Sequence, residues 1–222
     1  KIIGPDTSEC GTYDAPVEEM QRYLRAVTGK LEHFQLSQKV DGTEISVNGW
    51  FNGSTFLHPF DCTVEEKRFL AGNLGPRTGC ESNLVWMCQT PDLPDCTVVP
   101  IQSLLAREGY VGPIDLNSLI TKDGNPLGLE WTARLGFDAV QAWAHLFDNS
   151  LGEQLAAFAS GELTKWEVSD QLAVTLRVSM PPYPLWEPRV AQKFKGLPLD
   201  PRWLTDTTLT VDDVMLGPDG PQ

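Results

Sequence analysis

The sequence lacks the features of several protein classes. None of its five cysteines forms a Cys-x-x-Cys pair, and its three histidines, His33, His58 and His145, lie far apart. Both observations argue against a zinc site. No apolar run approaches the ~18 residues that a membrane-spanning helix requires, and no secretory signal pattern opens the printed sequence. Internal repeats and low-complexity blocks are absent as well.

Basic residues are also few. Seventeen Lys and Arg stand against 30 Asp and Glu, which gives a formal net charge of −13. An excess of this sign argues against nucleic acid or an anionic membrane surface as a partner. A small phosphorylated ligand stays compatible with it, because local cationic side chains and backbone N–H groups can hold an anion.

The cysteines are scattered and odd in number. Reduced thiols in a cytoplasmic protein are the simplest account of them. A single pairing of Cys88 with Cys96, across a Pro-rich loop, stays open.

Chemistry-bearing residues gather in the stretch Tyr110–Asp138. Two extended runs flank an Asp-Gly pair, which is a strong hairpin signal. With Asp123-Gly124 as a two-residue loop, Asn117 falls opposite Glu130, and Asp115 falls opposite Thr132. Because strand side chains alternate between faces, five polar side chains share one face: Asp115, Asn117, Glu130, Thr132 and Arg134. The opposite face carries Ile114, Leu116, Leu129, Trp131, Ala133 and Leu135.

The polar face of this hairpin combines oxygen donors with a planar cation. Mg²⁺ prefers hard oxygen ligands, and a guanidinium matches phosphate oxygens. The face therefore suits Mg²⁺ and a phosphorylated ligand. Antiparallel hairpins often have one solvated face, so a merely wet surface is the alternative interpretation.

The remaining patterns predict an α+β fold: an antiparallel sheet with helices packed to one side, followed by a small C-terminal β-rich segment. Helical spacing predicts four helices, at Pro16–Val27, Pro100–Glu108, Asp138–Phe147 and Leu151–Ser160. Strand patterns cover Phe34–Val40, Thr43–Phe51, Ser54–His58, Asn83–Cys88 and Gln171–Met180. We expect one domain over residues 1–165 and a C-terminal piece over residues 166–222. Lys1-Ile2-Ile3 has the pattern of a strand end, which predicts that the chain is a fragment.

Three motifs follow one another between Phe34 and Asp138. They are VDGTEIS at Val40–Ser46, EEKR and LGPRTG within Glu65–Gly79, and LEWTARLGFD at Leu129–Asp138. Together they resemble the ATP-grasp superfamily, and within it phosphoribosylamine–glycine ligase and its shorter phage-type relatives. The corresponding ligase segments read LEGEEFS, DHKR followed by TGPNTGGMG, and IEFNxRFGDPE. A weaker similarity continues to about Tyr183.

This resemblance implies an ATP-dependent carboxylate–amine ligase of purine biosynthesis that works through an acyl phosphate. It implies ATP as substrate, Mg²⁺ (or Mn²⁺) as cofactor, and small carboxylate and amine partners. The implied metal ligands are Asp115, Asn117, Glu130 and Thr132. The implied catalytic cations are Arg134 and Lys67. The implied ATP contacts are Lys1, Ser37, Gln38, Lys39, Val40 and Glu44, with Glu44 at the ribose. Substrate contacts fall on Arg77, Thr78 and Gly79.

The chain also departs from the family pattern. Thr132 stands where the family has an Asn metal ligand, and Ala139 stands where it has an acid. The Gly-rich flap over the ATP phosphates is not visible between Lys1 and Asp14, and the family's N-terminal substrate-binding domain has no counterpart in the printed sequence. Two alternatives therefore stay open: a nucleotide-binding relative without ligase turnover, and a non-catalytic interaction protein.

Overall fold

The structure is a computed structural model that describes residues 2–3, 17–27, 35–36, 40–148, 150–180, 183–184, 187–196, 198–211, 216–217 and 220–221. The chain divides into two compact units, residues 1–42 and 43–222. In the first unit, helix α1 (Val17–Val27) agrees with the predicted amphipathic helix. Strand β1 (Ile2–Ile3) pairs antiparallel with β2 (Gln35–Leu36), which confirms strand character for residues 2–3 and, of the strand predicted at Phe34–Val40, for residues 35–36; residues 1, 34 and 37–39 lie outside the described residues, and Val40 is not in a strand.

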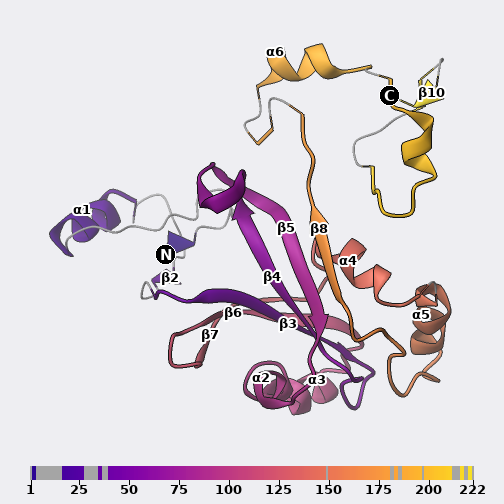
Figure 1. Cartoon of the computed structure of the whole chain (residues 1–222). Helices are drawn as coiled ribbons and strands as arrows, with labels where there is room; N and C mark the ends of the chain where they lie inside the picture. The colour runs from indigo at the N-terminus through magenta and orange to yellow at the C-terminus, as the bar shows by residue number, and fades with distance from the viewer. Residues whose placement is uncertain are drawn as a thin grey trace. The chain divides into compact units, whose positions relative to one another are not determined.

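A six-stranded sheet, antiparallel throughout, forms the body of the second unit (Figure 1). Its strands are β3 (Thr43–Phe51), β4 (Asp61–Arg68), β5 (Arg77–Met87), β6 (Gly112–Ile120), β7 (Pro126–Thr132) and β8 (Leu172–Leu176). Their spatial order is β7-β6-β3-β4-β5-β8, so the β6–β7 hairpin inserts beside β3 and β8 forms the opposite edge. The predicted α+β class is confirmed.

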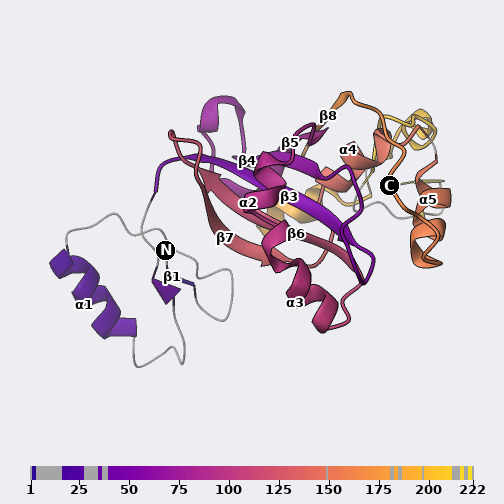
Figure 2. The same cartoon turned by 90° about the horizontal axis from the view of Figure 1, so that it is seen from below.

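Helices cover both faces of this sheet, so the prediction that they pack to one side is wrong (Figure 2). One face is covered by α2 (Asp92–Cys96), the 3₁₀ turn η3 (Val99–Ile101) and α3 (Gln102–Arg107). The other is covered by α4 (Ala139–His145) and α5 (Leu151–Ala159). The reason lies in β3, whose successive residues Trp50 and Phe51 point to opposite faces and are both buried.

Each face has its own hydrophobic core. The α2–α3 side buries Val47, Phe51, Phe56, Phe60, Cys62, Val98, Leu105, Ile114 and Leu116. The α4–α5 side buries Trp50, Leu57, Val85, Met87, Ala139, Ala142, Trp143, Leu146, Phe147, Phe158 and Trp166. The second core occupies only one end of its face, and the other end is polar.

The remaining described elements are short. The 3₁₀ turn η2 (Ala71–Asn73) lies between β4 and β5. The C-terminal stretch contains α6 (Pro188–Ala191), the 3₁₀ turns η4 (Gln192–Phe194) and η5 (Pro201–Leu204), and the strand pair β9 (Leu216–Gly217) and β10 (Gly220–Pro221). The predicted boundary at residue 166 stays a prediction. None of the described helices is long and apolar enough to cross a membrane.

The β6–β7 hairpin confirms the predicted pairs, Asn117 with Glu130 and Asp115 with Thr132. The predicted two-residue loop is wrong, because Thr121 and Asn125 close a longer one: the Thr121 N–H donates to the Asn125 carbonyl at 3.0 Å, and the Asn125 N–H donates to the Thr121 hydroxyl at 3.2 Å. A bulge beside Asn117 then adds one residue to β7. Loop and bulge offset each other, so the register of the polar residues is the predicted one.

Three other expectations fail. The predicted strand Ser54–His58 is only a bridge between Phe51 and Phe56, because the Asn52 side chain accepts from two backbone N–H groups and closes a tight turn. The Pro-rich loop expected between Cys88 and Cys96 contains α2. Cys62 and Cys88 form a disulfide with Cα atoms 6.3 Å apart, so neither fully reduced thiols nor a Cys88–Cys96 pair is observed. The β4–β5 register brings residues 62 and 88 together.

Candidate functional site

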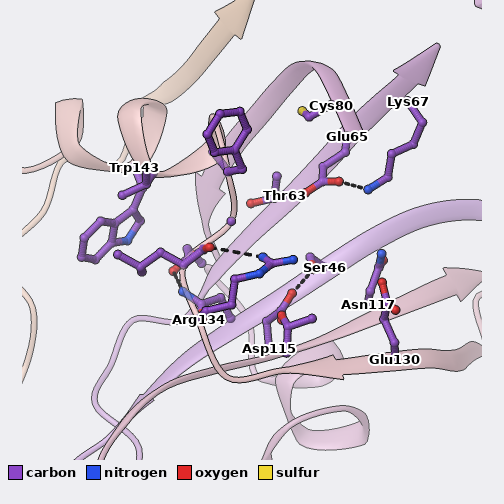
Figure 3. Close-up of a pocket in the computed structure, with 18 residues that line it drawn as sticks. Ser46, Thr63, Glu65, Lys67, Cys80, Asp115, Asn117, Glu130, Arg134 and Trp143 are labelled. Carbon is purple, nitrogen blue, oxygen red and sulfur yellow. Dashed lines mark hydrogen bonds and ion pairs between the residues drawn. The ribbon is translucent and has the colours of Figure 1, made fainter. Parts of the chain in front are cut away.

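A cavity of about 100 Å³ opens on the α4 side of the sheet, at its polar end (Figure 3). Strands β3, β4, β6 and β7 form its floor, and the segment from Arg134 to Trp143 lines the side toward α4. Its polar lining is Ser46, Asn48, Asp61, Thr63, Glu65, Lys67, Asp115, Asn117, Glu130, Thr132 and Arg134. Two cations thus face four carboxyl groups, an acidic excess that suits a divalent cation.

Two rows of polar side chains cross the strands beneath this cavity. The first row runs from β7 to β4 through Glu130, Asn117, Ser46 and Thr63. The second row, two residues along each strand, runs through Thr132, Asp115, Asn48 and Asp61. Directly opposed residues share a face, so the register of four strands suffices to gather all eight side chains.

Several oxygens in these rows have no partner. Buried oxygens of Asp115 (Oδ1), Asn117 (Oδ1), Thr132 (Oγ1) and Asn48 (Oδ1) accept no hydrogen bond from any described residue. A buried polar atom without a partner costs about 1–3 kcal/mol. Native structures pair most such atoms with protein, water or a ligand, and here they line one cavity. The cavity is therefore a candidate binding site, whose unpaired oxygens would be satisfied by a ligand or by ordered water.

The two aspartates of the second row are each held by one neighbour. The Ser46 hydroxyl donates to Asp115 Oδ2, which leaves Oδ1 as the free oxygen (Figure 3). The Asn48 amide donates to Asp61 Oδ1 at 3.0 Å. The pKa values of both aspartates are raised in the folded chain.

Burial dominates both shifts. It raises the pKa of Asp61 to about 7, although the Asn48 hydrogen bond lowers it, and the charge of Asp115 adds to the rise. Burial likewise raises the pKa of Asp115 to about 6, against the lowering effects of the Ser46 hydrogen bond and the Arg134 charge. The cost of desolvating these carboxylates is what a bound cation would offset.

Lys67 belongs to a charged network at the β4 side of the cavity. It forms an ion pair with Glu65 and lies 3.8 Å from Glu44, whose Oε1 also accepts from the Asn117 amide at 2.7 Å. Burial alone would lower the pKa of Lys67, but the hydrogen bond and charge of Glu65 and the charge of Glu44 outweigh it and raise the pKa. Glu44, predicted to contact the ribose, and Lys67, predicted as a catalytic cation, are therefore neighbours.

The other predicted residues are placed as follows. Arg134 lines the cavity and is largely exposed, with Nη1 donating to the Leu135 carbonyl at 3.2 Å. Thr78 is in β5, and its hydroxyl donates to the Lys67 carbonyl at 3.0 Å, so it supports the backbone that carries Lys67. Arg77 and Gly79 flank it in β5. Val40 belongs to the first unit and is half-buried. Lys1, Ser37, Gln38 and Lys39 lie outside the described residues.

Six lining residues with polar or thiol side chains were not predicted as site residues: Ser46, Asn48, Asp61, Thr63, Glu65 and Cys80. The alternation of Glu44, Ser46 and Asn48 along β3 was a usable signal, since its period matches the polar face of the hairpin. It was missed because no strand was predicted at residues 61–68, where β4 lies beside β3. Cys80 is a buried thiol, and burial together with the Glu65 charge raises its pKa to about 11.

The donor set fits a magnesium ion shared with a phosphorylated ligand. Among the described residues, no three His, Cys, Asp or Glu side chains are grouped so as to hold a metal ion by themselves. Mg²⁺ commonly takes only one or two carboxylates and completes its shell with waters and phosphate oxygens. Asp115, with one free oxygen beside the free oxygens of Asn117 and Thr132, provides that kind of partial shell.

Comparison with known proteins identifies the fold. No protein-family model matches the chain, and neither does any curated protein sequence. Among solved structures, the chain is similar to phosphoribosylamine–glycine ligase from Thermotoga maritima, with a TM-score of 0.58 and 22% identity over 77% of this chain and 46% of that one. This likeness shows that the predicted ATP-grasp-like fold is correct. The chain spans about half the length of that structure.

Two further structures are similar at lower scores. The phosphoribosylaminoimidazole carboxylase ATPase subunit from Aquifex aeolicus has a TM-score of 0.44 and 14% identity over 73% of this chain and 52% of that one. D-alanine–D-alanine ligase from Bacillus anthracis, complexed with ATP, has a TM-score of 0.36 and 16% identity over 68% and 47%.

Proposed function

We propose that this chain is an ATP-dependent carboxylate–amine ligase resembling phosphoribosylamine–glycine ligase, acting with Mg²⁺ and ATP through an acyl phosphate. One observation carries the proposal. Free buried oxygens of Asp115, Asn117 and Thr132 line one cavity, at the place where the sequence resemblance puts a metal site. The ATP-grasp-like fold supports the same assignment.

Mg²⁺ would be held from the strand floor of the cavity by Asp115, Asn117 and Thr132, with Glu130 at the more exposed edge. The ion supplies charge neutralisation to phosphate oxygens when bound. Ser46 holds one carboxylate oxygen of Asp115 and leaves the other without a partner. The chain's own residues therefore pre-organise the oxygen donors before any ligand binds.

Arg134 and Lys67 would bind the anionic groups. Arg134 is exposed, so it can pair with a phosphoryl group or a carboxylate. The paired N–H donors of its planar guanidinium match two oxygens of either group. Lys67 is held against Glu65 and near Glu44, so it acts as a fixed charge at the β4 side. Glu44, on the same network, would accept hydrogen bonds from the ribose.

The proposed reaction has two steps. The γ-phosphoryl of ATP is transferred to a carboxylate oxygen of the substrate, and ADP leaves. An amine then attacks the acyl carbon and displaces phosphate, so an amide bond forms and a proton is released. In such phosphoryl transfers the protein mainly positions the reactants and stabilises charge, which fits a cavity of preset oxygens and cations.

A second candidate is a nucleotide-binding ATP-grasp relative without turnover. Two features favour it. Thr132 provides a hydroxyl where an amide oxygen would be a stronger donor, and Lys67 is already neutralised by Glu65. A cavity of this kind can bind Mg-ATP and still lack the acceptor chemistry.

Product formation distinguishes the two functions. ADP release is measured with ATP, Mg²⁺, glycine and phosphoribosylamine, then with panels of small carboxylates and amines, using Asp115→Asn as the control. ADP release that requires both a carboxylate and an amine, and that the variant loses, supports the ligase. ATP binding without ADP release supports the second candidate. Absence of ATP binding contradicts both.

A further inference from the structure

Strand β8 and the residues after it present their apolar side chains to solvent. The alternating pattern at residues 171–180 predicts a half-buried strand with Leu172, Val174, Leu176 and Val178 inward. That prediction is wrong. These side chains are 66%, 69%, 71% and 93% exposed, whereas the residues between them are partly buried. An alternating apolar row is normally the face that a strand buries, so this row lacks a partner.

Polar contacts explain why the strand faces this way. Thr175 pairs with Asn83 of β5, whose amide donates to the Thr175 hydroxyl at 3.1 Å. Arg177 forms an ion pair with Asp138, at the start of α4. These two anchors fix Ala173, Thr175 and Arg177 on the α4 side of the sheet. The apolar row is therefore turned outward by the fold itself.

The outer edge of β8 also has no backbone partner among the described residues. This strand is the last of the sheet (Figure 1). Edge strands of soluble proteins are usually protected by charged side chains, proline or a bulge. The segment Leu172–Leu176, LAVTL, contains no charged residue and no proline, and its pairing with β5 is regular. The N–H and C=O groups of its outer edge can therefore pair with another strand.

The row is also symmetric about its own centre. Antiparallel pairing of β8 with an identical strand, with Val174 at the two-fold axis, puts Val174 opposite Val174 and Leu172 opposite Leu176. Ala173 then meets Thr175 on the other face. A two-fold axis joins a surface to itself and needs this kind of self-complementarity. Cross-strand pairs of apolar side chains stabilise such a joint.

We propose that β8 pairs antiparallel with β8 of a second copy of this chain, centred on Val174, and joins the two six-stranded sheets into one. This inference is independent of the proposed function. The net charge of −13 on each chain opposes association, but the strand at the joint is uncharged. Salt screens the long-range repulsion, so dimerisation strengthens as ionic strength rises.

The first test is the oligomeric state of the full chain by analytical ultracentrifugation over a range of protein concentrations. The wild type is expected to be a concentration-dependent dimer. Val174→Lys places two ammonium groups face to face and shifts the chain to monomer. Leu127→Lys is the matched control, because Leu127 lies on β7 at the other sheet edge and is 43% exposed; it leaves the dimer intact. Melting curves verify that both variants are folded.

The second test fixes the register. In a Cys10→Ser, Cys96→Ser background, Val174→Cys puts two thiols directly opposite each other, and mild oxidation links the copies covalently. Val178→Cys is more exposed but lies four residues from the axis in each copy, about 26 Å from its counterpart at ~3.3 Å per residue. It forms little cross-link. Random collision would favour position 178 over position 174.

The third measurement separates strand pairing from face-to-face packing of two apolar rows. Amide hydrogen exchange over residues 172–176 slows on dimerisation when the outer edge gains partners, and stays unchanged when only side chains meet. A wild type that is monomeric at every concentration overturns the proposal. So does a dimer that survives Val174→Lys, cross-linking at position 178 equal to that at 174, or unchanged exchange at β8.

Discussion

Strand β3 passes through two different environments on a single face of the sheet. At one end, Ser46 and Asn48 point into the polar cavity; two residues later, Trp50 is 7% exposed within a cluster of rings. Trp50 stacks on Trp143 with centroids 5.6 Å apart and meets Phe158 edge-to-face at 5.1 Å. The side chains of the aromatic end pack against one another, and its buried atoms without a partner among the described residues are the indole nitrogens of Trp50 and Trp166. The polar end keeps several buried oxygens without partners.

The two ends of this face therefore have different roles: the aromatic end stabilises the fold, and the polar end is suited to binding. The aromatic end gains free energy from burial and ring contacts, so it needs no ligand. The burial of carboxylates at the polar end lowers the stability of the fold, and a bound cation would offset that loss. Substitutions at the two ends should therefore have opposite consequences.

The largest expected effect is at the aromatic end. Trp50→Ala removes the ring at the centre of the cluster and should lower the free energy of unfolding by about 3–5 kcal/mol, the usual cost of emptying an aromatic core position. Urea unfolding followed by circular dichroism measures it. Trp203→Ala is the matched control, because Trp203 is 48% exposed in η5 and its removal should change stability by less than about 0.5 kcal/mol. Equal losses of unfolding free energy in Trp50→Ala and Trp203→Ala would contradict a stabilising role for the aromatic end.

The next effect is a pH dependence of stability from the polar end. The folded-state pKa values of Asp61 and Asp115 are raised to about 7 and about 6, so the folded chain keeps protons that the unfolded chain releases above about pH 4. Their contribution therefore lowers stability as pH rises from about 4 to about 7. Asp61→Asn should remove most of this slope and stabilise the chain at pH 8 by on the order of 2–4 kcal/mol.

Thermal melts of wild type and Asp61→Asn between pH 4.5 and 8 measure the slope. Asp200→Asn is the control, because Asp200 is on the surface, paired with Arg202, far along the chain from the cavity. Parallel curves for wild type and Asp61→Asn would show that Asp61 does not carry the penalty.

Asp115→Asn should affect stability and binding in opposite directions. The substitution removes a desolvated charge, so stability at neutral pH should not fall. It also removes the free carboxylate oxygen, so the affinity for Mg-ATP should drop at least about tenfold, which corresponds to about 1.4 kcal/mol. Calorimetry and a melting curve on one preparation measure both. A variant that unfolds more easily and still binds ATP normally would assign Asp115 to structure alone.

The smallest effect concerns Ser46, the residue that orients Asp115. Ser46→Ala leaves the carboxylate in place but frees its rotation, and should weaken Mg-ATP binding by about 1 kcal/mol, the typical value of one hydrogen bond. Ser46→Thr keeps the hydroxyl and should retain the affinity. The measurement is the ATP dissociation constant at several Mg²⁺ concentrations. Loss of affinity in both variants would indicate a packing effect and not an orienting hydrogen bond.

The sequence predicted the hairpin side of the cavity well, because its information is local. The alternation of Asp115, Asn117, Glu130 and Thr132 lies within one hairpin, where the longer loop and the bulge offset each other and keep the predicted pairs, and helical spacing predicted α1, α3, α4 and α5. The other half depends on pairing between distant strands. Asp61 and Thr63 enter the site only because β4 lies beside β3.

Long-range contacts also explain the failures elsewhere. The outward turn of β8 follows from the Thr175 and Arg177 anchors, one of which reaches Asp138 in another element. The Cys62–Cys88 disulfide follows from the β4–β5 register. Periodicity describes which side chains share a face, but the contacts of a few polar residues decide which face is buried.

Magnesium-dependent nucleotide binding at the polar end is tested most directly by calorimetric titration of the chain with ATP, with and without Mg²⁺. The wild type should bind ATP only when Mg²⁺ is present, and Glu130→Gln should lose this binding while its melting curve stays close to that of the wild type. Binding that ignores Mg²⁺, or that Glu130→Gln leaves unchanged, would contradict the metal assignment.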